Sequence, residues 1–240
     1  MNGIWVAVPA YTGEVKVNTA HALNIETMEA FNKKIPFMVV FHEQDPIISR
    51  CRNAMVMNFL ASDPKIFTDM IFLDSDVGFT PKTLLKLAAY PVDIVGAVYP
   101  YRGDPEGFPL QLLNEPREPE HGLVEVAGLP AGCLRISRRA LETMVAKFPE
   151  LEYIEDNVPQ KKAYALFDFV RMGKKFCGED YVFCALAREA GLRIWCDPDV
   201  DMMHIGIKHF KGNLARFMRA KALTPMERVL AFADKQKVAA

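Results

Sequence analysis

The sequence predicts an α/β fold in which a mostly parallel central sheet is flanked by helices on both faces. The first observation behind this prediction is that short apolar strands alternate with segments of helical period along the first half of the chain, an order typical of strand–helix–strand units. The second is size: 240 residues, half of them hydrophobic and a quarter charged, suit one globular domain with elaborations. The third is that no apolar run reaches membrane-spanning length.

Local patterns place the individual elements. Strands are expected where apolar and β-branched residues run together, and helices where apolar residues recur every three to four positions. The expected strands cover residues 4–9, 36–42, 70–74, 92–98, 133–136 and 192–196, with strand-like stretches near 164–170. The expected helices cover residues 18–34, 48–61, 81–89, 138–147 and 180–190, with Asn18 as the first N-cap and Gly191 as the last C-terminal stop. Residues 99–129 and 149–162 are irregular, and loops this long are usually functional or mobile.

The N-terminus and the cysteines predict a cytoplasmic protein without a membrane anchor. The chain has no basic segment before its first apolar run and turns at once into a strand, so we expect no signal peptide. Its five cysteines are odd in number and have no CxxC spacing. That usage favours reduced thiols over a disulfide framework or a zinc site.

The charge is distributed unevenly along the chain, although the formal net charge is only −1. From Asp201 onward there are eight Lys and Arg against three Asp and Glu, so this tail carries about +5 and the rest of the chain about −6. A basic tail on an acidic body can face an anionic substrate. A solvated helix face explains the same pattern, and the charge count alone favours that simpler interpretation.

Two carboxylates follow directly after an expected buried strand, in the sequence Asp74-Ser75-Asp76. Ligands of open α/β sheets bind at this edge of the sheet. Carboxylate oxygens there are suited to Mg²⁺ or Mn²⁺, ions that commonly share their coordination sphere with substrate phosphates. The alternative is an acidic turn in which Asp76 or Thr80 caps the helix that begins near Pro81.

Two further segments are expected near this edge. Pro9, Ala10 and Tyr11 leave the first strand beside the carboxylates, where Tyr11 can lie against a nucleobase; an ordinary strand-to-helix turn is the alternative. This loop contains neither G-x-G-x-x-G nor a P-loop signature. Arg52 and Asn53 lie in the first turns of the second helix, where arginine can clamp phosphate or hold carboxylates, although surface arginines are common on helices.

The second half of the chain supplies the remaining candidates. Glu179 and Asp180 begin a helix after a glycine, where the helix dipole stabilises anions and a carboxylate is suited to act as a general base. A plain N-terminal cap is the commoner use of such residues. His204 is a possible third metal ligand or a hydrogen-bonded core residue. Lys208 and Lys211 follow it and can meet a diphosphate.

The order of these segments resembles the GT-A glycosyltransferases. The resemblance is closest to a bacterial and phage branch that is similar to family 2-type transferases and to the mannosyltransferase subunits of fungal Golgi complexes. It implies a Rossmann-like GT-A domain over residues 1–206, with a small antiparallel element near the active site, and a basic, mostly helical tail over residues 207–240. The matching segments are residues 49–54, 72–77, 128–133, 178–183, 195–198 and 204–206.

The resemblance also implies roles for individual residues. Asp74, Asp76 and His204 would hold Mn²⁺ or Mg²⁺. Asp180 would be the carboxylate at the acceptor hydroxyl, with Glu179 as the second candidate for that role. The donor site would take its remaining residues from five segments of the chain. These residues are Pro9, Ala10, Tyr11, Arg52, Asn53, Ser75, Gly132 (for close approach of the sugar), Lys208 and Lys211.

These expectations together predict a metal-dependent hexosyl- or pentosyltransferase that uses a UDP- or GDP-sugar. The acceptor is open: a saccharide, a protein or a modified DNA base, the last because the basic tail favours phosphate backbones. A nucleotidyltransferase of related fold is a rival, but the N-terminal loop lacks the basic residues such enzymes usually carry. A catalytically silent nucleotide- or nucleic-acid-binding module is the other rival, and a donor-hydrolysis assay separates it from an enzyme.

Overall fold

The computed structural model describes residues 3–103, 107–155, 162–206 and 209–219. Its centre is a sheet of eight strands in the order β2-β1-β3-β8-β5-β13-β7-β6. Only β8 and β7 run against the other six, so the predicted, mostly parallel sheet is confirmed. The strands are β1 Gly3–Ala10, β2 Phe37–Glu43, β3 Phe67–Leu73, β5 Ile94–Gly96, β6 Gln111–Leu112, β7 Val124–Gly128, β8 Cys133–Ser137 and β13 Ile194–Cys196.

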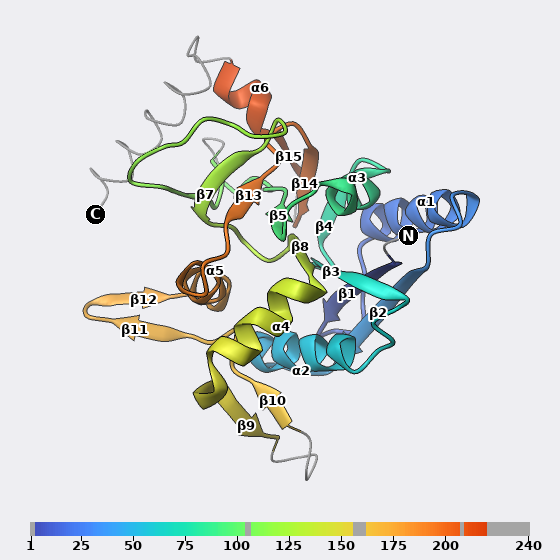
Figure 1. The fold of residues 1–240 in the computed structure, drawn as a ribbon. Helices are drawn as coiled ribbons and strands as arrows, with labels where there is room; N and C mark the ends of the chain where they lie inside the picture. Colours follow the sequence, from blue (N-terminus) through green and yellow to red (C-terminus); the bar gives the residue numbers. More distant parts are fainter. Residues whose placement is uncertain (1–2, 104–106, 156–161, 207–208, 220–240) are drawn as a thin grey trace.

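Helices cover both faces of this sheet and give the molecule two hydrophobic cores (Figure 1). Alternation along β1 shows the division, since Ile4 and Val6 pack on the side of α1 and α3 whereas Ala7 packs on the side of α2, α4 and α5. No helix in the described ranges is long and apolar enough to span a bilayer. The helices are α1 Val17–Asn32, α2 Ile48–Leu60, α3 Thr83–Ala89, α4 Arg138–Lys147 and α5 Glu179–Glu189.

A three-stranded antiparallel sheet lies beside the carboxyl edge of the central sheet. It consists of β4 Val77–Phe79, β14 Asp201–Ile205 and β15 His209–Asn213, with β14 in the middle. The sequence did not predict these strands individually, because each is short and lacks a clear alternating pattern. β4 begins directly after Asp76, so this sheet is the small antiparallel element that was expected near the carboxylates.

Two hairpins and two short helices complete the described chain. One hairpin joins β9 Glu152–Ile154 to β10 Lys162–Tyr164, and the other joins β11 Val170–Met172 to β12 Lys175–Cys177. A 3₁₀ turn covers Pro149–Leu151, and α6 covers Leu214–Arg219. The proposed division at residue 206 stays a prediction, but β15 pairs with β14 across it, so the first part of the tail is a strand of the small sheet.

The predicted cap at Asn18 is wrong, and so is the alternative in which Asp76 or Thr80 caps the third helix. The first helix begins at Val17 with Lys16 at the N-cap, so Asn18 lies inside it. The third helix begins at Thr83 after Lys82, whose φ of 77° is left-handed, and no side chain of the N-cap residue bonds its first turn. Instead, the backbone N–H of Leu84 donates to the buried Glu26 carboxylate at 2.9 Å. Asp76 therefore caps no helix, and the simpler explanation of the acidic turn is removed.

Candidate active site

A cavity of about 510 Å³ opens at the carboxyl edge of the sheet, where β1 and β3 end. It brings together residues from the loop after β1, from α2, from the turn after β3 and from the start of α5. Eight of the residues predicted from the sequence line it: Pro9, Tyr11, Arg52, Asp74, Ser75, Asp76, Glu179 and Asp180. The other described lining residues are Thr12, Asp45, Pro46, Ile48, Cys51 and Tyr99.

Arg52 is the centre of the polar network in this cavity. It lies on the buried face of α2, and its guanidinium forms ion pairs with Glu179 of α5 and with Asp74, the latter at 2.9 Å. Its Nε is buried and donates to no described acceptor. A buried guanidinium holds carboxylates in fixed orientation through its forked donors, so Arg52 fixes α5 relative to the end of β3.

Asp180 lies next to this ion pair, and its pKa is raised. Burial, and then the negative charge of Glu179, raise the pKa of Asp180 to about 6, partly offset by the positive charge of Arg52. A carboxylate with such a pKa is mostly ionised at neutral pH but still accepts a proton readily. That is the property a general base requires.

Asp76 lines the cavity, whereas His204 does not line it and instead packs against the lining residue Tyr99, with ring centroids 4.8 Å apart. Arg102 pairs with Asp76 and also donates to the backbone oxygen of Ile205 at 3.0 Å. The Nδ1 atom of His204 lies 3.0 Å from the backbone oxygen of Pro100. Because a carbonyl only accepts, Nδ1 carries the proton and Nε2 keeps its lone pair. Burial, and then Arg102, lower the pKa of His204, which favours the neutral ring.

The donor atoms of Asp74, Asp76 and His204 suit a Mn²⁺-type ion. Carboxylate oxygens and a neutral imidazole fixed by a backbone carbonyl are common ligands of such ions. Within the described ranges, however, no three His, Cys, Asp or Glu side chains are grouped closely enough to hold a metal ion as they stand. The carboxylates are neutralised instead by Arg52 and Arg102.

Two predicted donor-site residues lie behind the cavity and support it. A Cβ atom on Gly132 would come within 2.6 Å of both Asp74 Oδ2 and Tyr99 Oη, so the glycine makes room for these two side chains. The side-chain amide of Asn53 accepts from the backbone N–H of Phe167 at 2.9 Å and donates to its oxygen at 2.8 Å. Neither residue is among those that line the cavity.

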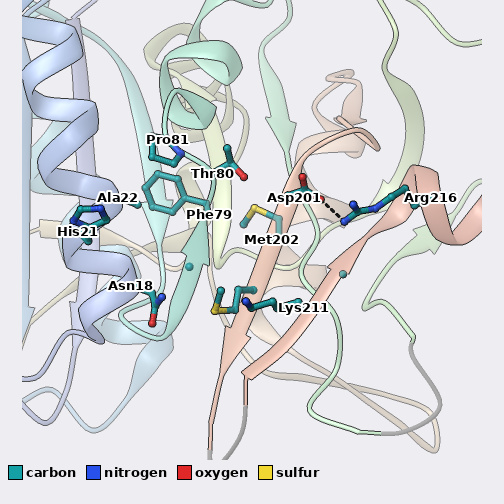
Figure 2. A pocket seen from close by; sticks show the side chains of 13 residues that line it. Asn18, His21, Ala22, Phe79, Thr80, Pro81, Asp201, Met202, Lys211 and Arg216 are labelled. Atoms are coloured by element: carbon teal, nitrogen blue, oxygen red, sulfur yellow. Dashed lines mark hydrogen bonds and ion pairs between the residues drawn. The ribbon is translucent and has the colours of Figure 1, made fainter.

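The remaining predicted residues are placed differently. Ala10 is buried between the lining residues Pro9 and Tyr11. Lys211 lines another cavity, of about 360 Å³, between α1 and the small sheet (Figure 2). Lys208 lies outside the described residues.

Sequence reasoning missed Tyr99 and Arg102. Both follow β5, whose carboxyl end reaches the same edge as Asp74, and this position was the signal that could have identified them. Arg102 meets Asp76 directly, whereas Lys211 lines the other cavity. From the sequence alone, this segment is an irregular loop without a pattern that singles out either residue.

The fold and the cavity together define an α/β protein with a polar cleft at the carboxyl edge of its sheet. No family model and no curated protein matches the chain. Among solved structures, the chain is similar to A197 from STIV, with a TM-score of 0.55 and 18% identity over 88% of this chain and 94% of that one. At this identity the likeness shows the fold alone.

Two glycosyltransferases of known structure overlap the chain more loosely. One is the catalytic domain of Drosophila β1,4-galactosyltransferase 7, with a TM-score of 0.46 and 11% identity over 82% of this chain and 65% of that one. The other is a glycosyltransferase involved in glycosylation of the major capsid of PBCV-1, with a TM-score of 0.34 and 13% identity over 61% and 66%.

Proposed function

We propose that the protein is a glycosyltransferase that moves a hexose or pentose from a UDP- or GDP-sugar to a hydroxyl group, with Mn²⁺ or Mg²⁺ as cofactor. The observation that carries the proposal is the convergence of two acidic pairs on one cavity, near the buried Arg52; a fifth lining carboxylate, Asp45, pairs with Arg50. Asp74 and Asp76 come from the end of β3, and Glu179 and Asp180 come from the start of α5. Such an arrangement provides one acidic pair for a cation and a separate one for an acceptor.

Asp74, Asp76 and His204 would hold the cation, which supplies positive charge to the leaving diphosphate when bound. For Asp76 to become a ligand, Arg102 has to release it. Arg102 is exposed enough to turn, and a guanidinium binds phosphate oxygens well. We therefore assign the diphosphate contact to Arg102 rather than to Lys211, which lines the other cavity.

Asp180 would serve the acceptor. In an inverting transfer, its carboxylate takes the proton of the acceptor hydroxyl while the acceptor oxygen bonds to the anomeric carbon. The bond from that carbon to the diphosphate oxygen breaks, and the nucleoside diphosphate leaves. In a retaining transfer the same carboxylate would position the acceptor. Glu179 contributes indirectly, because it pairs with Arg52 and its charge raises the pKa of Asp180.

Tyr11 supports the nucleotide end of the proposal. Its ring is exposed at the mouth of the cavity, beside Pro9, where a nucleobase can stack on it. The acceptor remains a saccharide, a protein or a modified DNA base. The basic tail that favoured DNA lies mostly outside the described residues, so DNA binding stays a prediction.

The test is a thermal-shift panel of UDP-, GDP-, CMP- and dTDP-sugars with and without Mn²⁺, followed by donor hydrolysis with the stabilising sugar. A bound donor raises the melting temperature through mass action. Asp76→Ala should abolish the metal-dependent part of both signals. Asp201→Ala is the matched control, because this exposed carboxylate pairs with Arg216 in the other cavity (Figure 2). Undiminished turnover in Asp76→Ala would remove the metal assignment.

A further inference from the structure

The hairpin of β11 and β12 projects from the body of the molecule beyond α5 (Figure 1). Within the described residues, neither of its strands pairs with a third strand. A lone two-stranded hairpin is only marginally stable in water, so a surface that covers it would also stabilise it. The side chains that this hairpin exposes indicate the chemistry of such a surface.

Apolar side chains are exposed on both faces of the hairpin. Phe176 is 71% exposed, and its ring stacks on that of Phe169 with the centroids 5.5 Å apart. Opposite residues of a hairpin share a face, so Arg171, which is opposite Phe176, belongs to the face of this aromatic pair. Successive side chains alternate between the faces, so the exposed Val170 lies on the other one. A partner that covered a single face would leave the apolar side chains of the other face in water.

The charged side chains of the hairpin are all positive. Arg171, Lys174 and Lys175 are exposed, and residues 169–178 contain no Asp or Glu. Within the part of the chain that the structure describes, none of these three cations forms an ion pair. Unpaired cations beside exposed apolar groups favour a partner that is anionic and apolar at once. A bilayer that contains anionic lipids has both properties.

A cavity of about 750 Å³ adjoins the hairpin at Lys175. Its charged lining residues are Lys175, Arg188 of α5, Arg117 and Glu115. Arg117 pairs with the buried Glu125. Arg188, like Lys175, forms no ion pair within the described ranges. The cavity therefore has an excess of positive charge, which suits the phosphate of a lipid headgroup.

We propose that the hairpin inserts into the surface of a bilayer that contains anionic lipids, and that the adjoining cavity receives the phosphate of a headgroup. Insertion covers the apolar side chains of both faces at once, which a strand of nucleic acid lying on one face does not. The stems of Arg171, Lys174 and Lys175 can enter the apolar layer while their charges reach the headgroups. Such a contact lies on the membrane surface and needs no spanning helix. The inference does not depend on the proposed function, and each can fail without the other.

The test is co-sedimentation of the full chain with vesicles of phosphatidylcholine, alone or mixed with phosphatidylglycerol. We expect binding to the mixed vesicles only, weakened by added salt. Because the basic tail can attract anionic vesicles by charge alone, insertion of the hairpin is measured separately. In Phe176→Trp, tryptophan emission should shift to shorter wavelength with the mixed vesicles, and lipids with brominated chains should quench it. The wild type, whose Trp5 and Trp195 lie in the central sheet, is the reference, and a variant that emits like it would overturn the proposal.

Phe176→Ser and Arg188→Ala test the two parts of the proposed surface. Phe176→Ser should weaken binding to the mixed vesicles on the order of tenfold, because the phenyl ring no longer enters the lipid. Arg188→Ala should also weaken it, because the cavity loses a cation. Phe31→Ser is the matched control: this phenylalanine is 81% exposed but lies on α1, away from the hairpin (Figure 1), so its replacement should leave binding unchanged. Far-ultraviolet circular dichroism confirms that each variant folds.

Two further results would overturn the proposal. Binding to the mixed vesicles that survives both Phe176→Ser and Arg188→Ala would use another surface. Binding to single-stranded DNA that Phe176→Ser abolishes, without binding to either kind of vesicle, would identify a nucleic acid as the partner of the hairpin.

Discussion

Two aspartate–arginine pairs lie near opposite ends of the same strand, β3, and they have different environments. Near its start, Asp69 pairs with Arg135 and accepts from the Thr68 hydroxyl at 2.7 Å, with its side chain 1% exposed. Just past its end, Asp74 pairs with Arg52, and its side chain is 26% exposed at the wall of the cavity. The same pair of residue types thus stabilises the fold at one end and leaves a carboxylate accessible to ligands at the other.

Removing the buried carboxylate of Asp69 should have the largest effect, and it should act on folding stability. Asp69→Ala leaves Arg135 buried without its counter-ion, and breaking a buried pair in this way costs about 3–5 kcal/mol of folding stability. Chemical denaturation should show this loss. Asp74→Ala is the comparison, and it should cost less because water can reach Arg52 from the cavity. Equal losses would mean that the two ends do not differ as described.

Asp180→Asn should have the next largest effect, and it should act on turnover. Loss of a general base lowers the rate of transfer by about 10²-fold or more. In the wild type, the rate should rise as the pH is raised through about 6, where Asp180 ionises, and then level off. The variant should lose this part of the pH profile. A variant with the wild-type rate and profile would exclude Asp180 as the base.

The same substitution should change stability in the opposite direction. The raised pKa of Asp180 means that the folded protein favours the protonated form, so stability is lost as the pH rises through about 6. Asp180→Asn removes this penalty. The variant should be more stable than the wild type above pH 7, by on the order of 2 kcal/mol, and equally stable below about pH 4. Thermal unfolding at several pH values measures the difference.

Arg102→Ala should have the smallest effect, and its sign should depend on the ligand. In the wild type, Mn²⁺ has to displace the Arg102 guanidinium from Asp76. Without that guanidinium, Mn²⁺ should bind more tightly in the absence of a donor sugar. UDP or GDP should bind up to about tenfold more weakly, because a charged contact to the diphosphate is lost. Titration calorimetry of each ligand tests this, with Arg216→Ala as the control. Weaker binding of both ligands would contradict the exchange of partners at Asp76.

The sequence predicts the core of the fold because the signals there are local. The strand at 4–9 is an unbroken apolar run and the helix at 48–61 has apolar residues at helical spacing, and both appear within one or two residues of the expected bounds. The short strand β4 was missed because its pairing with β14 joins residues more than 120 positions apart. Pairings of that kind leave no local pattern.

The candidate site was predictable in its residue types but not in its contacts. The order of the acidic segments brought Asp74, Asp76 and Asp180 into one hypothesis. The position of Arg102 after an expected strand places it at the same edge of the sheet, but its irregular loop gives no indication that it would meet Asp76 in particular. The same limit applies to Lys211, which was placed near the diphosphate because it follows His204, although it lies on a neighbouring strand that lines another cavity.

The paired contacts of Arg52 and Asn53 have a consequence for how the chain folds. Arg52 reaches Glu179 across 127 positions, and Asn53 holds Phe167 across 114. Closing such long loops is entropically unfavourable, so contacts of this kind form slowly and late. During synthesis, the first half of the chain can build β1, α2 and β3 while the cavity still lacks its second wall. The cavity is completed only after residue 180 has emerged and α5 has docked.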